Sequence, residues 1–161
     1  MISVSILTLS DKGSQGQRED RSGPEIAEIV KTIGATVVNY EILPDEKNIL
    51  REKLIALCSS SDIIFTTGGT GLTPRDITPE TTLEVIEKEV PGIAEAMRLE
   101  GLKKTPYAML SRAVAGIRGK TLIINLPGSP KAVRENLEAI LRTLPHAVEK
   151  IKGSTEECAR K

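Results

Sequence analysis

Two hydrophobic patterns alternate along the first half of the chain. Residues 4–9, 36–43 and 62–66 are short apolar or β-branched runs, which are typical of buried strands. Between these runs, apolar residues in segments 26–33 and 50–58 recur at the spacing of one face of an amphipathic helix. The order β-α-β-α-β predicts a parallel sheet with right-handed crossover connections.

The second half of the chain adds two helices and a β-hairpin. Helical patterns cover residues 78–89 and 93–100, and a Pro-Gly pair separates them. Residues 113–117 and 121–126 have the composition of two strands, and the turn between them has only three residues. A turn this short joins antiparallel neighbours, so we expect one strand to run against the others.

A long amphipathic helix follows Ser129 and Pro130, and Pro145 is expected to bend it. Together the elements predict an α/β fold, a three-layer sandwich with a mostly parallel sheet and one antiparallel edge strand. We expect residues 1–152 to form a single domain and residues 153–161 to be a charged, frayed tail.

The composition argues against nucleic acid as a partner. The 161 residues include 22 basic and 22 acidic side chains, and a chain without excess positive charge is not built to bind nucleic acid. Two tyrosines and one phenylalanine are the only aromatic residues, too few for stacking platforms on single strands. The core must therefore consist of aliphatic side chains.

Cysteine and histidine offer no metal cluster. Cys58 falls on the apolar side of a predicted helix, where a buried thiol is expected, and Cys158 lies in the polar tail. His146 has no neighbour at metal-binding spacing, so we expect it to have a surface or structural role.

The sequence shows no segment that would direct the chain to a membrane. It begins as a strand rather than as a basic segment followed by a long apolar one. No apolar run approaches the roughly 20 residues that a membrane-spanning helix needs. We therefore expect a cytoplasmic protein that does not bind membranes.

Four polar segments follow predicted strands. In open α/β sheets, ligands bind beyond the carboxyl ends of the strands, so these segments should converge on one site. They are Ser10-Asp11, Pro44-Asp45, residues 68–76, and residues 125–130.

The segment after the third strand carries the strongest signal. It reads Thr66-Thr67-Gly68-Gly69-Thr70-Gly71 and continues to Arg75, Asp76 and the helix start at Thr78-Pro79. It is neither a P-loop, because no lysine follows the glycines, nor the dinucleotide fingerprint, whose glycine spacing differs. A plain tight turn remains an alternative, but the hydroxyls and the arginine favour an anion site.

Two aspartates follow strand ends, and each has two interpretations. Asp45 could cap the next helix, and Asp76 could simply bind its own loop. If both face one cleft with a nucleotide, they suit Mg²⁺, which proteins typically hold with one or two carboxylates plus substrate phosphates.

The segment after the last strand is the second candidate patch. Gly128 allows close approach to the backbone, and the N–H groups that follow Ser129 could bind phosphate; the alternative is an ordinary turn with a capped helix. Ser111 and Arg112, just before the hairpin, could add an anion contact or form part of the surface.

These motifs resemble those of the MogA/MoaB family of molybdenum-cofactor biosynthesis proteins, whose domain also occurs as the G domain of gephyrin. The similarity spans nearly the whole chain in the family's order. The matching stretches are residues 7–11, 66–80, 110–113 and 124–131.

The resemblance implies transfer of AMP from ATP to the terminal phosphate of molybdopterin, release of pyrophosphate, and a requirement for Mg²⁺. It implies that Asp45 and Asp76 are catalytic and hold the metal through the substrate phosphates. It also implies a homotrimer and contact with other molybdenum-cofactor biosynthesis proteins. The residues that it implies for nucleotide and pterin binding are Ser10, Asp11, Thr67, Gly68, Gly69, Thr70, Gly71, Ser111, Arg112, Asn125, Pro127, Gly128 and Ser129.

The chemistry agrees with the residues present. Transfer between phosphates needs positioning and charge neutralisation more than a protein nucleophile, and the attacking phosphate is already an anion. The form of residues 74–79 and 125–130 favours the MogA branch. A MoaB-like pterin-binding protein without adenylylation activity and a trimeric assembly module are the alternatives.

Overall fold

The computed structural model describes residues 1–155 and contains a six-stranded sheet. The strands are β1 (Ile2–Leu9), β2 (Ala35–Leu43), β3 (Ile63–Thr67), β4 (Lys88–Glu89), β5 (Ala115–Arg118) and β6 (Thr121–Leu126). Their order is β2-β1-β3-β6-β5-β4. The four strands β2, β1, β3 and β6 are parallel, whereas β5 runs antiparallel to both β6 and β4. This confirms the mostly parallel sheet with an antiparallel edge.

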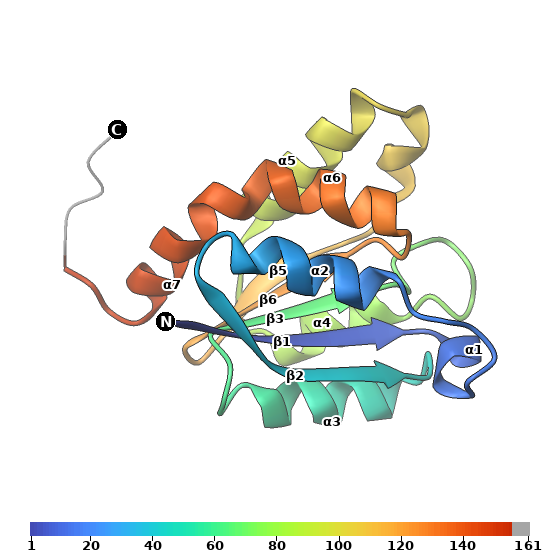
Figure 1. Cartoon of the computed structure of the whole chain (residues 1–161), viewed down its shortest axis with the longest axis horizontal. Helices are drawn as coiled ribbons and strands as arrows, with labels where there is room; N and C mark the ends of the chain where they lie inside the picture. The colour runs from blue at the N-terminus through green and yellow to red at the C-terminus, as the bar shows by residue number, and fades with distance from the viewer. Residues whose placement is uncertain (156–161) are drawn as a thin grey trace.

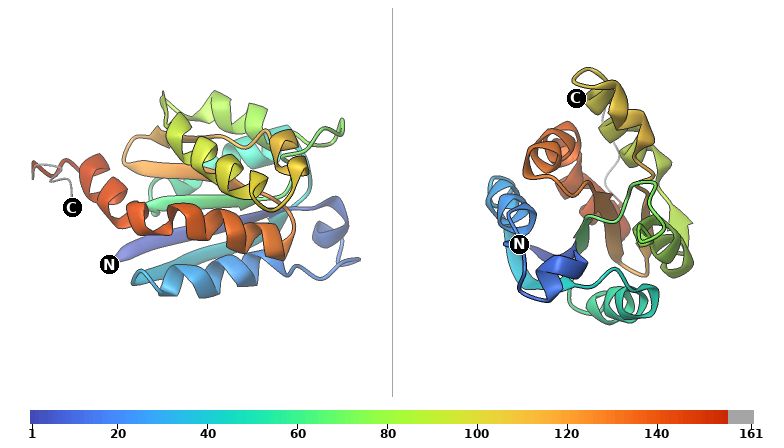
Figure 2. Two further views of the ribbon diagram at one scale, coloured as in Figure 1. Left: turned by 90° about the horizontal axis from the view of Figure 1, so that it is seen from above. Right: turned by 90° about the vertical axis from the view of Figure 1, so that its right-hand side faces the viewer.

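Helices cover both faces of the sheet, as Figure 1 shows. The helices on one face are α2 (Ser22–Lys31), α5 (Pro91–Leu102), α6 (Pro130–Ile140) and α7 (Leu144–Ile151), and those on the other are α3 (Lys47–Leu57) and α4 (Thr78–Val85). The right-hand view of Figure 2, which looks along the strands, shows helices on both sides of the sheet. The predicted three-layer arrangement is confirmed.

Strand alternation divides the core between the two faces. On β1, Val4 and Ile6 pack under α2 and α6, while Leu7 and Leu9 pack against α3. Successive residues of a strand point to opposite faces, so a strand that is apolar at every position is buried on both sides. This explains the mainly apolar runs at β1 and β3, which are buried at almost every position, whereas the edge strand β2 alternates between exposed and less exposed positions.

The helix predicted over residues 78–89 is wrong at its end. Helix α4 stops at Val85, and Lys88 and Glu89 form β4. Glu87 N–H donates to the Ile117 carbonyl at 2.7 Å, and Val90 N–H donates to the Ala115 carbonyl at 2.8 Å. The open edge of β5 thus captures a segment whose local sequence permits a helix.

Three short helices were not predicted: α1 (Asp11–Ser14), and the 3₁₀ helices η1 (Pro106–Leu110) and η2 (Leu141–Thr143). None has a buried side chain, and each has only three to five residues, too few for a helical periodicity to be recognised. The bend expected at Pro145 is an interruption at η2, with Pro145 in the first turn of α7. Residues 156–161 of the predicted tail, including Cys158, lie outside the described part of the chain.

Candidate functional site

The segment after β3, residues 68–76, is called the glycine loop. It crosses the carboxyl ends of the strands, and this end of the molecule faces the viewer in the right-hand panel of Figure 2. Gly68 and Gly69 have φ values of 93° and 67°, which favour glycine. A Cβ on Gly68 would lie 2.5 Å from the backbone carbonyl oxygen of Leu9, at the end of β1. Thr78, the first residue of α4, donates through Oγ1 to the Gly68 carbonyl and through N–H to the Gly69 carbonyl. The loop is therefore fixed between β1 and α4.

The carboxylates of Asp45 and Asp76 both lie close to glycines of this loop. The Asp45 Oδ1 atom is 3.2 Å from the position that a Cβ of Gly69 would take, and Asp76 Oδ2 is 2.9 Å from that of Gly71. Burial raises the pKa of Asp45, and the negative charges of Asp11 and Asp76 raise it further. Two carboxylates that follow different strands are thus close enough to repel each other.

Asp45 does not cap α3. The residue before that helix is Glu46, which makes no capping hydrogen bond through its side chain. Instead Asp45 Oδ2 accepts from the N–H of Asp11 at 3.1 Å, and the N–H of Asp45 donates to Asp11 Oδ1 at 2.9 Å. This reciprocal pair joins the loops after β1 and β2. The helix-cap interpretation of Asp45 is therefore wrong.

Arg75 binds the same cluster from the glycine loop. Its Nε and Nη2 atoms each donate to a different oxygen of Asp11 at 3.0 Å, and Nη2 also lies 2.9 Å from Glu46 Oε1. The hydrogen bond from Arg75 lowers the pKa of Asp11. Asp11 is therefore charge-balanced, whereas Asp45 has no arginine or lysine bound to it among the described residues.

Asp76 is held in place by its own loop and by Arg112. Thr73 donates to Asp76 Oδ2 through N–H at 2.9 Å and through Oγ1 at 2.8 Å. The Arg112 guanidinium donates to the carbonyls of Gly71 and Asp76 and pairs with Glu80. Arg112 was predicted as an anion contact, but here its donors brace the glycine loop. Ser111 Oγ accepts from the N–H of Ala113.

A cavity of about 550 Å³ also adjoins the glycine loop. Its lining includes predicted site residues from three loops: Ser10, Thr67, Gly68, Gly128 and Ser129. Asp45 and Asp76 are not part of this lining. The candidate site thus has two halves, an acidic one beside Gly69 and Gly71 and a cavity lined by Gly68.

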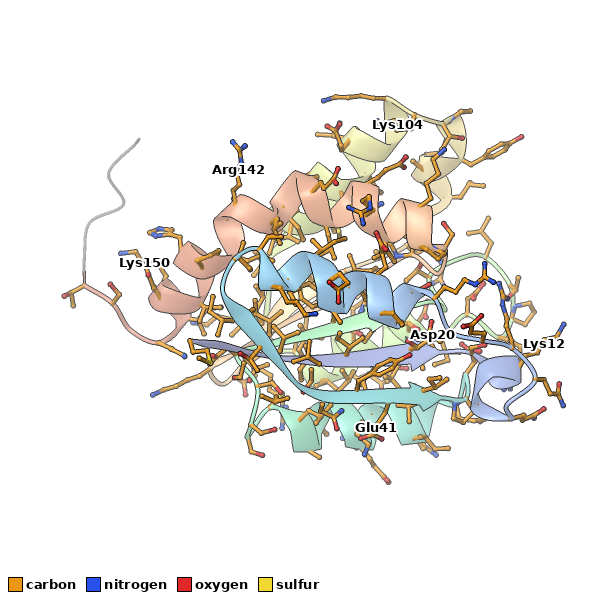
Figure 3. The ribbon with its side chains drawn as sticks, in the orientation of Figure 1. Lys12, Asp20, Glu41, Lys104, Arg142 and Lys150 are labelled. Atoms are coloured by element: carbon orange, nitrogen blue, oxygen red, sulfur yellow. The ribbon has the colours of Figure 1, made fainter. Side chains whose placement is uncertain are left out.

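Sequence reasoning missed one wall of the cavity. Arg18, Asp20 and Arg21, which precede α2, and Ser22, its first residue, line the cavity. The other lining residues are Thr8, Leu9, Gly13, Glu19 and Pro130. Asp20 lies at the carboxyl ends of β1 and β2, as its label in Figure 3 shows. Four consecutive charged residues from 18 to 21, directly before a helix, were the signal that could have identified this wall.

Asn125 is not in the cavity, which corrects its prediction as a pocket residue. Its side chain is fully buried; Nδ2 donates to the hydroxyls of Thr66 and Thr82, each at 2.9 Å. Its Oδ1 accepts from the N–H of Val114 at 3.2 Å. These bonds join β3, β6, α4 and the segment before β5, so Asn125 organises the core beneath the site.

The residues after Asn125 are closer to the cavity. The Pro127 carbonyl accepts from Thr67 Oγ1 at 2.7 Å. Ser129 Oγ accepts from the N–H of Ala132 at 3.2 Å, so Ser129 caps α6 as predicted. Thr70 is buried, and its carbonyl accepts from Arg112 N–H.

The acidic half can hold a divalent cation only with help from a ligand. No group of three or more His, Cys, Asp or Glu side chains in residues 1–155 is arranged to bind a metal. Within that range, no hydrogen bond is made to Oδ1 of Asp45 or to Oδ1 of Asp76. Two available carboxylate oxygens in a site of excess negative charge suit Mg²⁺ when substrate phosphates complete its coordination.

This architecture places the protein among the α/β proteins that bind ligands beyond the carboxyl ends of a parallel sheet. No helix in the described residues is long and apolar enough to span a bilayer. The comparison with known families is more specific: residues 5–146 match the family described as a probable molybdopterin binding domain. The chain belongs to this family.

Relatives of the chain agree with this assignment. It is 45% identical over 157 residues to the molybdopterin adenylyltransferase of Helicobacter pylori, covering 95% of this chain and 89% of that protein. It is 44% identical to gephyrin of Dictyostelium discoideum over 90% of this chain and 22% of gephyrin. The crystal structure of the molybdopterin biosynthesis enzyme MoaB from Thermus thermophilus superposes with a TM-score of 0.90 at 52% identity, covering 96% of this chain and 98% of that one. The resemblance to the MogA/MoaB family and to gephyrin is confirmed.

Proposed function

We propose that this protein is a molybdopterin adenylyltransferase, which transfers AMP from ATP to the terminal phosphate of molybdopterin. The observation that carries the proposal is the pair Asp45 and Asp76, which lie beside neighbouring glycines of the glycine loop, close enough for the charge of Asp76 to raise the pKa of Asp45. The similarity to the Helicobacter pylori adenylyltransferase over most of both chains supports it.

In the proposed reaction, a phosphate oxygen of molybdopterin attacks the α-phosphorus of ATP. A new P–O bond forms to the α-phosphorus, the bond between that phosphorus and the bridging oxygen breaks, and pyrophosphate leaves. The attacking oxygen is already deprotonated, so no general base is needed. This agrees with the donors and carboxylates found at the site.

Each half of the site has a part in this reaction. Asp45 and Asp76 would hold Mg²⁺ together with the substrate phosphates, and the ion would supply charge neutralisation as the phosphates approach. The Thr70 hydroxyl and the N–H groups of Gly69 to Gly71 would bind phosphate oxygens. Asp11 and Arg75 would keep Asp45 in place, because Asp45 shares two backbone-to-carboxylate bonds with Asp11.

The test is to follow the fate of the α-phosphate. ATP labelled at that phosphate is incubated with Mg²⁺, molybdopterin and the protein, and the pterin product is isolated. The proposal requires the label on the pterin in equal amount to the pyrophosphate released. Pyrophosphate or AMP release without labelled pterin would show ATP hydrolysis instead and would contradict it.

A second candidate is a pterin-binding protein that does not adenylylate. The similarity to a structure titled MoaB, at 52% identity, favours considering it. This candidate predicts saturable binding of molybdopterin with no pyrophosphate release at any ATP concentration. The isotope experiment separates the two directly.

We also propose that the chain assembles into a homotrimer. It would be cytoplasmic and would contact other molybdenum-cofactor biosynthesis proteins. Exposed apolar side chains that gather on α5 and η1, which pack together, support assembly. They are Leu99, Leu102, Tyr107, Met109 and Leu110. Sedimentation equilibrium would test it: a trimer mass for the wild type, and a lower mass for Tyr107→Asp, are expected if this surface is the interface.

A further inference from the structure

Asp20 is a carboxylate in the cavity wall, and every group that donates a hydrogen bond to it is neutral. Its Oδ1 accepts from Ser22 N–H at 2.9 Å, and its Oδ2 accepts from Thr8 Oγ1 at 2.6 Å and from the Tyr40 hydroxyl. The N–H of Gly23 is shared between both oxygens, at 3.3 and 3.2 Å. No lysine or arginine in residues 1–155 makes an ion pair with it. A carboxylate accepts about four hydrogen bonds, so Asp20 has no capacity left for a ligand and acts on the protein itself.

The groups bound to Asp20 come from three elements. Thr8 is a buried residue near the end of β1, Tyr40 is on β2, and Ser22 and Gly23 begin α2. Any Cβ on Gly23 would collide with the Tyr40 ring and would lie 2.6 Å from Asp20 Oδ2. Burial and the hydrogen bond to Asp20 raise the pKa of Tyr40, so its hydroxyl remains a donor at neutral pH. The close contact of Gly23, Tyr40 and Asp20 leaves no room for a side chain at position 23.

Ser22 connects the cluster to the turn after β6, which also lines the cavity. Its Oγ donates to the Gly128 carbonyl at 2.5 Å, across 106 residues of sequence. The peptide bond is planar, and the structure has no cis peptide among its described residues, so a fixed Gly128 carbonyl also fixes the opposite direction of the Ser129 N–H. Thr67 holds the preceding carbonyl, that of Pro127, from the glycine-loop side. Two neighbouring carbonyls of the turn are thus bonded to the last residue of β3 and the first residue of α2.

We propose that Asp20 and Ser22 are positioning residues, which hold the peptide group between Gly128 and Ser129 in one orientation at the cavity wall so that it can bind substrate. Asp20 places Ser22, and Ser22 places the peptide. The functional part of this inference rests on the proposed function, with molybdopterin as the probe.

The experiment compares Ser22→Ala and Asp20→Asn with a matched control, Ser59→Ala, which also removes a serine hydroxyl bonded to a carbonyl but lies away from the cavity. The first readout needs no ligand: the ¹³C′ resonance of Gly128 and the ¹⁵N resonance of Ser129 report the hydrogen bond to the Gly128 carbonyl. Both resonances are expected to move in Ser22→Ala and in Asp20→Asn, and to stay in place in the control.

The second readout is the affinity for molybdopterin, followed by pterin fluorescence without ATP. We expect it to weaken about tenfold in both variants, as loss of one ordered hydrogen bond would do, while turnover at saturating molybdopterin stays within about threefold. A stability defect alone would not separate affinity from turnover in this way. If Asp20→Asn does not fold, Tyr40→Phe removes a single bond from the same carboxylate and replaces it.

The outcomes are distinct. An unmoved Gly128 resonance in Asp20→Asn overturns the structural coupling. A moved resonance with molybdopterin affinity within twofold of wild type overturns the role in binding. A wild-type protein that binds molybdopterin but releases no pyrophosphate defeats the proposed function, yet weaker binding by the variants would still support this inference. A wild type that does not bind molybdopterin overturns both.

Discussion

Gly68 should tolerate no side chain, and replacing it with alanine tests the tight passage of the glycine loop over β1. Two costs combine at this position. An alanine at φ 93° carries a backbone penalty of about 1–2 kcal/mol. Its Cβ would also lie 2.5 Å from the Leu9 carbonyl oxygen, a contact that real Cβ atoms do not make. Overpacking of this kind costs about 1–3 kcal/mol more, since the end of β1 is held by strands on both sides.

Gly34 provides the matched control. Its φ of 72° imposes the same type of backbone penalty, but a Cβ there would meet nothing within 4 Å. Thus Gly34→Ala should lose about 1–2 kcal/mol and Gly68→Ala about 2–5 kcal/mol of unfolding free energy. For a chain of this length, each kcal/mol lowers Tm by about 2–4 °C.

The assay is thermal and urea unfolding of both variants at equal protein concentration, with the wild type as reference. We expect Gly68→Ala to be the less stable variant by about 1–3 kcal/mol and to lose activity, because relief of the clash must displace the loop. Equal destabilisation of the two variants would refute the reasoning, since it would mean that the loop does not approach Leu9 closely.

Three further predictions concern the polar groups around the loop. Asp45→Asn should abolish activity and leave the free energy of unfolding at pH 7.5 unchanged or up to about 1 kcal/mol higher. The reason is that folding raises the pKa of Asp45. Its contribution to stability is therefore present at low pH and is lost as the pH rises through the folded-state pKa. A clear loss of urea stability at pH 7.5 would contradict this. Asn125→Ala should lower the free energy of unfolding in urea by about 2–4 kcal/mol, because the Val114 N–H loses its partner inside the protein. Wild-type stability would contradict this structural role and return Asn125 to the candidate ligand contacts. Arg75→Ala should raise the pKa of Asp11 in a carboxyl NMR titration, and an unchanged value would show that Arg75 does not hold this carboxylate.

The parts of the fold that sequence predicted are those in which burial is periodic. Apolar runs identified β1 and β3, and β-branched composition identified β2. The short turn predicted at residues 118–120 identified the β5–β6 hairpin, whose turn in the structure is Gly119, at φ 56°, and Lys120. Elements without buried side chains gave no such signal. Strand β4 consists of two exposed residues, and it exists because the edge of β5 lies beside it.

The candidate site was predictable where the chain itself supplies the geometry. Asp45 and Asp76 each follow a parallel strand, so the sheet brings them to one edge. The wall from Arg18 to Ser22 was missed because its position depends on contacts across the fold, such as that of Ser22 with Gly128. Asn125 was misplaced for the same reason: only the register of β3 and β6 shows that it faces a buried hydroxyl rather than the cavity.

The central claim is that two carboxylates at the glycine loop support nucleotidyl transfer to a pterin. Pyrophosphate release is the most direct measure, with ATP, Mg²⁺ and molybdopterin present, in the wild type and in folded Asp45→Asn and Asp76→Asn proteins. We predict release by the wild type that depends on molybdopterin and is reduced by at least about a hundredfold in each variant, a loss of the order found when a charge-stabilising group is removed. Release by Asp76→Asn at the wild-type rate would contradict the account.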